Sequence, residues 1–182
     1  LISGTKKFVG LDQFIRILSE DALFTKSLIN TLFWTSSSLF FQFTLGLLLA
    51  LILNSGFRGK KLVQPILFIP WAVPSFLIGL MWVWMFNPVT GPLPYIFEAI
   101  GILNEPENIL SDPDMAMWGP IVANVWFGIP FFTIMLLAAL RSIPNDIYEA
   151  SSIDGISGFQ AFRHITVPLI APTIIITLLI RA

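Results

Sequence analysis

Residues 143–172 form a polar interruption between two apolar runs, and they carry the most regular spacing in the chain. Glu-Ala-Ser at residues 149–151 is followed by three residues and Gly155, then by nine residues and Ile-Thr-Val-Pro at residues 165–168. Ile147 and Tyr148 add apolar groups to a loop that should be wet, and an exposed apolar patch usually indicates a partner. The chemistry we expect here is docking of another protein.

This stretch should fold as two short helices. Pro144 is tolerated in a first helical turn, where its missing N–H costs nothing, and Gly155 can take the left-handed conformation that ends a helix. Ser157 can cap the second helix, and Pro168 should mark its limit. The alternative is an ordinary amphipathic helix-turn-helix at the membrane interface, without a partner.

A second set of residues has the chemistry of a sugar site. Trp71 and Ser75 are four residues apart, so they should share a helix face, and Asn124, Phe127 and Gly128 should do the same on another helix. A sugar needs an aromatic plate for its apolar face and polar groups for its hydroxyls, and glycine lets a ligand approach the backbone. The alternative for each residue is packing between helices.

The composition argues against several other kinds of chemistry. The chain has no cysteine and one histidine, so thiolate metal sites are excluded and a histidine metal site or catalytic triad is not expected. A net charge of −1 lacks the basic footprint of a nucleic-acid binder. Gly59-Lys60-Lys61 resembles the tail of a phosphate-binding loop but lacks its first glycine and its final Ser/Thr. A membrane-embedded enzyme would need paired carboxylates or histidines within the spans, and the clearly intramembrane segments offer none.

The hydrophobic content predicts an all-α membrane protein. Hydrophobic residues make up 55% of the 182 and charged residues only 12%, against about 25% charged in soluble domains. Because about 20 apolar residues span a bilayer, we expect spans at residues 27–54, 64–86, 116–140 and 169–182, the last incomplete. Residues 1–26 should form an extracytoplasmic amphipathic segment, with a soluble linker as the alternative.

The second span and the end of the chain carry unusual residues. Pro65, Pro70 and Pro74 should kink the second span, and because freed carbonyls are tolerated only against protein or water, that helix should line a cavity. Residues 87–115 read as a polar loop. Arg181 would sit well inside the fourth span, with no partner that the sequence identifies.

The distribution of cations predicts the orientation. The loop at residues 55–63 has three Lys or Arg residues, the loop at residues 141–168 has two, and residues 87–115 have none. Cytoplasmic loops carry the excess of cations, so the first two loops should be cytoplasmic and the third should lie outside. The lysines in residues 1–26 weaken this asymmetry without reversing it.

The spacing of residues 149–168 resembles the EAA loop of binding-protein-dependent ABC-importer permeases, in which E-A-A, a glycine and I-x-L-P recur at these intervals. Ser151 replaces the second alanine and Val167 replaces leucine, both conservative in size. Further stretches resemble the carbohydrate branch of that family, which includes the maltose permeases. They are Phe-Val-Gly-Leu at residues 8–11, Ile-Pro-Trp-Ala-Val-Pro-Ser-Phe at residues 69–76 and Asn-Val-Trp-Phe-Gly-Ile-Pro at residues 124–130.

The resemblance implies a helical bundle of the MetI-like permease type, in a bacterial or archaeal plasma (inner) membrane, with further spans before residue 1 and after residue 182. It implies a non-enzymatic half of a sugar or oligosaccharide importer, without a cofactor, that works with a solute-binding protein, a second permease and ATPase subunits. A permease for an amino acid, peptide or oxyanion is the alternative. The implied substrate-binding residues are Trp71, Ser75, Asn124, Phe127 and Gly128. The implied ATPase-coupling residues are Glu149, Ala150, Ser151, Asp154, Gly155, Ile165 and Pro168.

Overall fold

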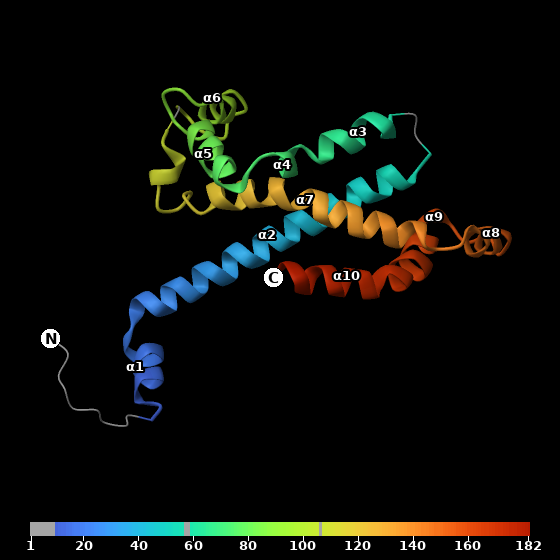
Figure 1. The fold of residues 1–182 in the computed structure, drawn as a ribbon, viewed down its shortest axis with the longest axis horizontal. Helices are drawn as coiled ribbons and strands as arrows, with labels where there is room; N and C mark the ends of the chain where they lie inside the picture. Colours follow the sequence, from blue (N-terminus) through green and yellow to red (C-terminus); the bar gives the residue numbers. More distant parts are fainter. Residues whose placement is uncertain (1–9, 57–58, 106) are drawn as a thin grey trace. The chain divides into compact units, whose positions relative to one another are not determined.

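The computed structural model describes residues 10–56, 59–105 and 107–182, and within these ranges all the regular structure is helical (Figure 1). The prediction of an all-α chain is therefore confirmed. The chain divides into two compact units, Leu1–Ser36 and Ser37–Ala182, and helix α2 (Ala22–Asn54) runs across the boundary between them. Residues 8 and 9 of the stretch 8–11, on which part of the resemblance rests, lie outside the described residues.

The first unit contains helix α1 (Asp12–Glu20), which confirms a helix in the N-terminal segment. Its Arg16 and Glu20 form an exposed i,i+4 ion pair at 3.4 Å. Its position on the membrane surface stays a prediction. Helix α2 begins five residues before the predicted span at residues 27–54, because the side chain of Asp21 accepts hydrogen bonds from the N–H groups of Leu23 and Phe24 at 2.9 and 3.2 Å.

The predicted second span is not one kinked helix. It consists of α3 (Lys60–Leu67), α4 (Ile69–Ala72) and α5 (Ser75–Met85), and the axis turns by 98° between α4 and α5. The break falls at Val73, whose φ of −95° and ψ of 129° are extended. A residue that precedes proline is driven out of the helical region by the proline ring, so Pro74 ends α4 rather than bending a continuous helix.

Residues 87–115 are only partly a loop, which corrects the prediction. They contain helix α6 (Pro92–Ala99) and a short 3-10 turn, η1 (Ile109–Ser111). Pro92 begins α6 because proline has no N–H to lose in a first turn. The third predicted span, residues 116–140, corresponds to one apolar helix, α7 (Trp118–Arg141), which is long enough to cross a membrane.

The polar stretch before the last span has the predicted helical hairpin. Helix α8 (Asn145–Ile153) follows Pro144, and Gly155 reverses the chain with a φ of +72°. Ser157 caps the next helix: its hydroxyl accepts from the N–H of Gln160, whose side chain accepts from the N–H of Ser157. These local predictions are confirmed.

Pro168 does not end the second helix of the hairpin, contrary to the prediction. Helix α9 (Gly158–Ala161), a π-helical turn η2 (Phe162–Thr166) and α10 (Val167–Arg181) form one continuous candidate span, Gly158–Arg181. In the widened turn the N–H of Val167 donates to the carbonyl of Phe162, five residues back. Such a turn accommodates a following residue without an N–H, so the helix that contains the fourth predicted span begins at Gly158 instead of residue 169.

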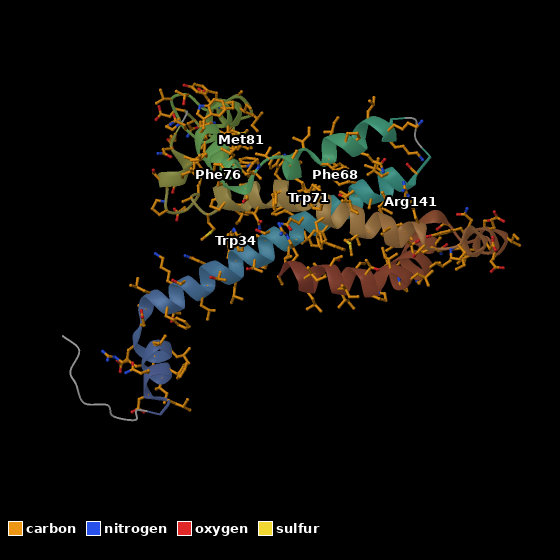
Figure 2. The ribbon with its side chains drawn as sticks, in the orientation of Figure 1. Trp34, Phe68, Trp71, Phe76, Met81 and Arg141 are labelled. Carbon is orange, nitrogen blue, oxygen red and sulfur yellow. The ribbon has the colours of Figure 1, made fainter. Side chains whose placement is uncertain are left out.

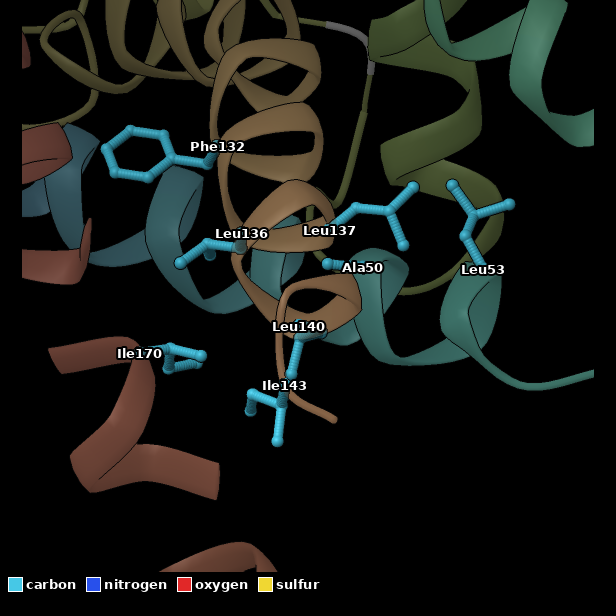
Figure 3. Close-up of a cluster of buried hydrophobic side chains, with 8 residues drawn as sticks. All are labelled: Ala50, Leu53, Phe132, Leu136, Leu137, Leu140, Ile143 and Ile170. Carbon is cyan, nitrogen blue, oxygen red and sulfur yellow. The ribbon is translucent and has the colours of Figure 1, made fainter. Parts of the chain in front are cut away.

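The core of the second unit lies between α2, α7 and α10. Figure 3 shows its buried side chains, Ala50, Leu53, Phe132, Leu136, Leu137, Leu140, Ile143 and Ile170. Three described helices are long and apolar enough to cross a membrane, namely α2, α7 and Gly158–Arg181. The bent α3–α5 segment is a fourth, broken candidate.

Thiol labelling tests the predicted orientation. In this cysteine-free chain, Lys61→Cys and Ser157→Cys should react with a membrane-impermeant maleimide only from the cytoplasmic side, and Glu105→Cys only from outside. All three side chains are exposed, so access to each thiol depends on the side of the membrane. The measurement is labelling of intact cells against inside-out vesicles. Reaction of Glu105→Cys from the cytoplasmic side would overturn the orientation.

Candidate functional site

The polar residues predicted on α7 meet a side chain from α2. Asn124 and Gly128 are one turn apart, and the amide of Gln42 lies directly over Gly128. A Cβ at residue 128 would overlap that amide, so the missing side chain of Gly128 makes room for Gln42. The Gln42 Nε2 group donates to the Asn124 carbonyl at 3.0 Å. In this structure Gln42 fills the space that Gly128 was expected to leave for a ligand, and a role for Gly128 at a sugar site stays a prediction.

Arg181, for which the sequence identified no partner, joins the same cluster from α10. Its Nε donates to Gln42 Oε1 at 3.2 Å, and its Nη2 donates to Asn124 Oδ1 at 3.5 Å. Its Cζ lies 5.8 Å from the centroid of the Phe127 ring, within the range of a cation–π contact. Ionisable residues inside a span normally face other helices or a water-filled path and mark functional sites, and Arg181 follows this pattern.

A cavity of about 470 Å³ opens beside Arg181. Trp71 contributes from α4, Ser75 from α5, Phe127 and Phe131 from α7, and Ile180 with Arg181 from α10; the remaining lining residues are Val73 and Pro74. Figure 2 shows Trp71 against α7, where its Nε1 donates to the Phe127 carbonyl at 3.2 Å. A mostly apolar hollow with a few convergent polar groups is the usual form of a small-molecule site.

A second, more apolar cavity of about 390 Å³ adjoins the first, since Ser75 and Phe127 line both. Asn124 also lines it, together with aromatic side chains of α5 and the segment after it, Trp82 and Phe86. Four of the five predicted substrate residues thus lie on two neighbouring cavities. The exception is Gly128, which is covered by Gln42.

Trp71 and Ser75 do not share a helix face, because α4 ends before α5 begins. They still line the same cavity, since the break at Val73 turns the chain around it. Gln42 and Arg181 were absent from the predicted set. The sequence feature that could have identified both is a polar residue in an otherwise apolar span. That feature does not show which residue is the hydrogen-bond partner, here 139 residues away in the sequence.

Helix α8, which carries Glu149, Ala150 and Ser151, lies at the end of α7 away from α5 and α6 (Figure 1). Glu149, Ala150, Asp154, Gly155 and Pro168 are exposed, whereas Ile165 is half-buried.

Large apolar side chains are exposed beside the predicted coupling residues: Ile153 is 86% exposed and Phe159 is 72% exposed. Ser151 is buried, and its hydroxyl donates to the Tyr148 carbonyl at 2.8 Å. Tyr148 and Thr166 share a hydrogen bond of 2.9 Å that joins α8 to the π turn. Ser151 and Ile165 therefore belong to the support of this surface rather than to its exposed face.

Metal chemistry finds no support in the described residues, where no group of three or more His, Cys, Asp or Glu side chains could hold an ion.

A family model described as "Binding-protein-dependent transport system inner membrane component" matches residues 42–182. The chain is 39% identical to the trehalose/maltose transport system permease protein MalF of Thermococcus litoralis, over 97% of this chain and 59% of that protein. It is 34% identical to the sn-glycerol-3-phosphate transport system permease protein UgpA of Agrobacterium fabrum, with the same coverage. The chain thus spans about three-fifths of the length of these curated relatives.

Among solved structures, a chain of a bacterial ABC transporter that imports the acidic polysaccharide alginate superposes with a TM-score of 0.81. It is 30% identical, and the match covers 97% of this chain and 62% of that one. A second structure of an alginate transporter, in complex with an alginate pentasaccharide-bound periplasmic protein, gives a TM-score of 0.80 at 31% identity, over 95% of this chain and 60% of that one. The predicted permease-type helical fold is confirmed by this likeness.

Proposed function

The chain belongs to the family of binding-protein-dependent transport system inner membrane components, and from this premise we propose that it forms part of the path of a sugar or oligosaccharide through an ATP-driven importer. It is a multi-pass membrane protein of the inner membrane. The named relatives are transport permeases, and permeases for maltose or trehalose and for maltodextrin are among them. These names support a sugar as the solute.

The cavity beside Trp71 is the observation that carries this proposal. It joins aromatic walls from Trp71, Phe127 and Phe131 to the hydroxyl of Ser75 and the guanidinium of Arg181. The aromatic faces suit the apolar face of a sugar ring, and the polar groups suit its oxygens. The cavity is lined by α4, α5, α7 and α10, so a shift between these helices would change its shape.

The partners follow from the same premise. We propose a solute-binding protein outside, a second permease that completes the path, and ATPase subunits bound to the surface of α8 and α9. The periplasmic protein bound to the solved alginate transporter supports the first of these. The exposed charge of Glu149 among the apolar side chains of Ile153 and Phe159 supports the third, because such patches mark protein contacts. ATP hydrolysis then belongs to a separate chain.

Substitutions in the cavity test the solute path. In the complete transporter, Trp71→Ala should raise the sugar concentration needed for half-maximal uptake, because the aromatic wall is lost. Asn124→Ala should do the same, because it removes an acceptor that holds Arg181. A lost hydrogen bond typically costs about 0.5–1.5 kcal/mol, so we expect an effect of about 3-fold to 10-fold for Asn124→Ala. Uptake of radiolabelled sugar into proteoliposomes provides the measurement.

Two controls separate this effect from general damage. Trp71→Phe keeps an aromatic wall and should retain more uptake than Trp71→Ala. Trp84→Ala removes an exposed tryptophan of α5 that lines neither cavity, and it should transport normally. Co-purification with the ATPase should be the same for all variants. Normal uptake by both Trp71→Ala and Asn124→Ala would remove this cavity from the sugar path.

A further inference from the structure

We propose that Tyr148 and Thr166 are positioning residues, whose hydrogen bond fixes α8 to the helix that contains α10 and so transmits a displacement of α8 to the cavity. This inference rests on the proposed function, because the displacement would come from the bound ATPase. Three features of the helical hairpin support it: a chain of two hydrogen bonds, the burial of that chain, and the π turn that orients it.

The two hydrogen bonds lead from α8 to the backbone of the following helix. The hydroxyl oxygens of Tyr148 and Thr166 are 2.9 Å apart, and the Thr166 hydroxyl donates to the Ala161 carbonyl at 3.4 Å. A threonine hydroxyl has one proton to donate, so with that proton on Ala161 the Tyr148 hydroxyl is the donor to Thr166. Consecutive hydrogen bonds of this kind polarise and strengthen one another. The side chain of Tyr148 is thus tied to the start of the helix that contains α10.

The hydrogen-bonded groups are enclosed by the hairpin and the core. Thr166 is 5% exposed and Ala161 is 8% exposed, and Tyr148 packs against the buried cluster of Figure 3. Water therefore competes little for the two hydroxyls, and a hydrogen bond is stronger where the local dielectric is low. A buried hydroxyl that loses its partner is also costly. Both effects hold α8 against the π turn.

The π turn determines which way Thr166 faces. In an α-helix a threonine hydroxyl bonds to a carbonyl three or four residues back, as Thr177 does with the Thr173 carbonyl in α10. Thr166 instead reaches Ala161, five residues back, because the turn is widened. One residue corresponds to about 100° of rotation around a helix, so an α-helical turn here would rotate α10 relative to α9 and separate Thr166 from Tyr148. Turns of this kind often lie at functional sites.

The hydrogen bond bypasses the weaker of the two chain connections of α8. One connection is the short link from α7, and the other runs through the turn at Gly155 and α9 to α10. Residues 152–160 of the second connection are exposed, so little packing prevents it from bending. The bond between Tyr148 and Thr166 joins the two ends of this segment directly. Because α10 packs in the core through Ile170 and also lines the cavity, a shift of α8 would reach the cavity.

The distance between α8 and α10 tests the link directly. In this cysteine-free chain, assembled with partner subunits that lack cysteine, Asp146→Cys and Leu169→Cys each carry one spin label. Both positions are exposed. For the nucleotide-free transporter we expect one narrow label-to-label distance distribution by double electron–electron resonance. Tyr148→Phe or Thr166→Val should abolish the narrow distribution, and Thr166→Ser, which keeps the hydroxyl, should retain it.

The number of ATP molecules hydrolysed per sugar imported tests the consequence. Partial unfolding lowers hydrolysis and uptake together and leaves this ratio unchanged, whereas a loose link between α8 and α10 lets hydrolysis proceed without transport. A lost hydrogen bond shifts an equilibrium by about threefold to tenfold, and we expect the ratio to rise by a similar factor in Tyr148→Phe and in Thr166→Val. Because both changes remove the same bond, the double variant should be no worse than either single variant.

Matched controls remove the same chemical groups elsewhere. Thr177→Val deletes a buried hydroxyl that donates to carbonyls of its own helix, and Tyr95→Phe deletes a phenol hydroxyl that bonds to the segment before α6. Both variants should keep the unaltered ratio of ATP to sugar and the narrow distance distribution. Co-purification with the ATPase should be the same for all variants, since the hydroxyls of Tyr148 and Thr166 lie behind the exposed face of α8.

Three results would overturn the proposal. They are an unaltered ratio in both Tyr148→Phe and Thr166→Val, additive effects in the double variant, and loss of ATPase binding in Tyr148→Phe, which would place that residue in the contact itself. Failure of the proposed function looks different, because the unaltered transporter would then take up no sugar. The distance measurement does not depend on uptake, so it still shows whether the hydrogen bond holds α8 to α10.

Discussion

Gly46→Leu is expected to remove correctly folded protein from the membrane, because Gly46 lies where α2 and α7 touch. A Cβ at residue 46 would stand 2.5 Å from the Phe132 Cβ and 3.2 Å from the Thr133 backbone nitrogen. Neither atom can move without moving α7. Phe132 is fully buried in the cluster of Figure 3, so the strain would pass directly into the core.

Gly46 belongs to a stripe of small or polar residues at four-residue intervals along α2. Ser38, Gln42, Gly46 and Ala50 are all buried, which brings one face of α2 against its neighbours. Small residues permit such close approach between membrane helices. Overpacking usually costs about 1–3 kcal/mol and sometimes more, and a leucine adds its whole side chain where even a methyl group does not fit.

The matched control for this change is Gly79→Leu. Gly79 also lies inside a helix, α5, but a Cβ there would meet no atom within 4 Å. Both substitutions replace glycine with the same good helix former, so the difference between them reports packing and not helix propensity. Thermal unfolding in detergent and the yield of monodisperse protein are the measurements. Equal stability of the two variants would show that α2 and α7 do not pack as described.

Features set by local chemistry were predictable from the sequence. The positive φ of Gly155 and the helix cap at Ser157 were expected because each depends on residues within one turn. The same holds for α7, where a long apolar run ends at Arg141.

Proline was harder to interpret, because its effect depends on its surroundings. Pro74 ends α4, with Val73 in an extended conformation. Pro168 instead lies in the first turn of α10, after a π turn has widened the helix. The two prolines offer the same missing N–H and the same ring. The difference lies in the backbone before each proline, which is extended at Val73 and π-helical before Val167, and spacing alone does not encode it.

The residues that line the candidate cavity could be predicted from the sequence, but the hydrogen bonds between them could not. Trp71, Ser75, Asn124 and Phe127 were chosen for their chemistry and do line cavities. The hydrogen bonds of Arg181 to Gln42 and Asn124 join residues 139 and 57 positions apart. Such pairings depend on how α2, α7 and α10 pack against one another. A single sequence does not show which residues of these helices lie opposite each other.

Glu149→Lys and Gly155→Val are each expected to abolish uptake and to weaken or uncouple the ATPase, while the protein still inserts in the membrane. Glu149 is exposed on α8, and in the proposed function it pairs with a basic group of the ATPase. When one charge of an interfacial pair is removed, the other is left buried, at a cost of about 2–5 kcal/mol. A lysine at residue 149 would add repulsion to that loss.

Gly155 acts through the backbone and not through contacts. Its φ of +72° turns the chain from α8 into α9, and a Cβ there would meet no atom within 4 Å. A β-branched residue resists this conformation, and backbone strain of this kind costs about 1–3 kcal/mol. Gly155→Val should therefore reorient α8 relative to α9 and misplace Glu149 and its apolar neighbours. Uptake, ATPase co-purification and ATPase stimulation by the loaded binding protein are the three measurements.

Each change has a control in the same hairpin. Gly158 is also exposed with open space around it, but its φ is not in the left-handed region, so Gly158→Val should be much milder than Gly155→Val. Asp146→Lys reverses another exposed acid of α8 outside the predicted coupling set, and it should retain most uptake. A surface hairpin without a partner would tolerate all four substitutions alike. Normal uptake and normal ATPase binding in both Glu149→Lys and Gly155→Val would therefore overturn the assignment of α8 as the coupling surface.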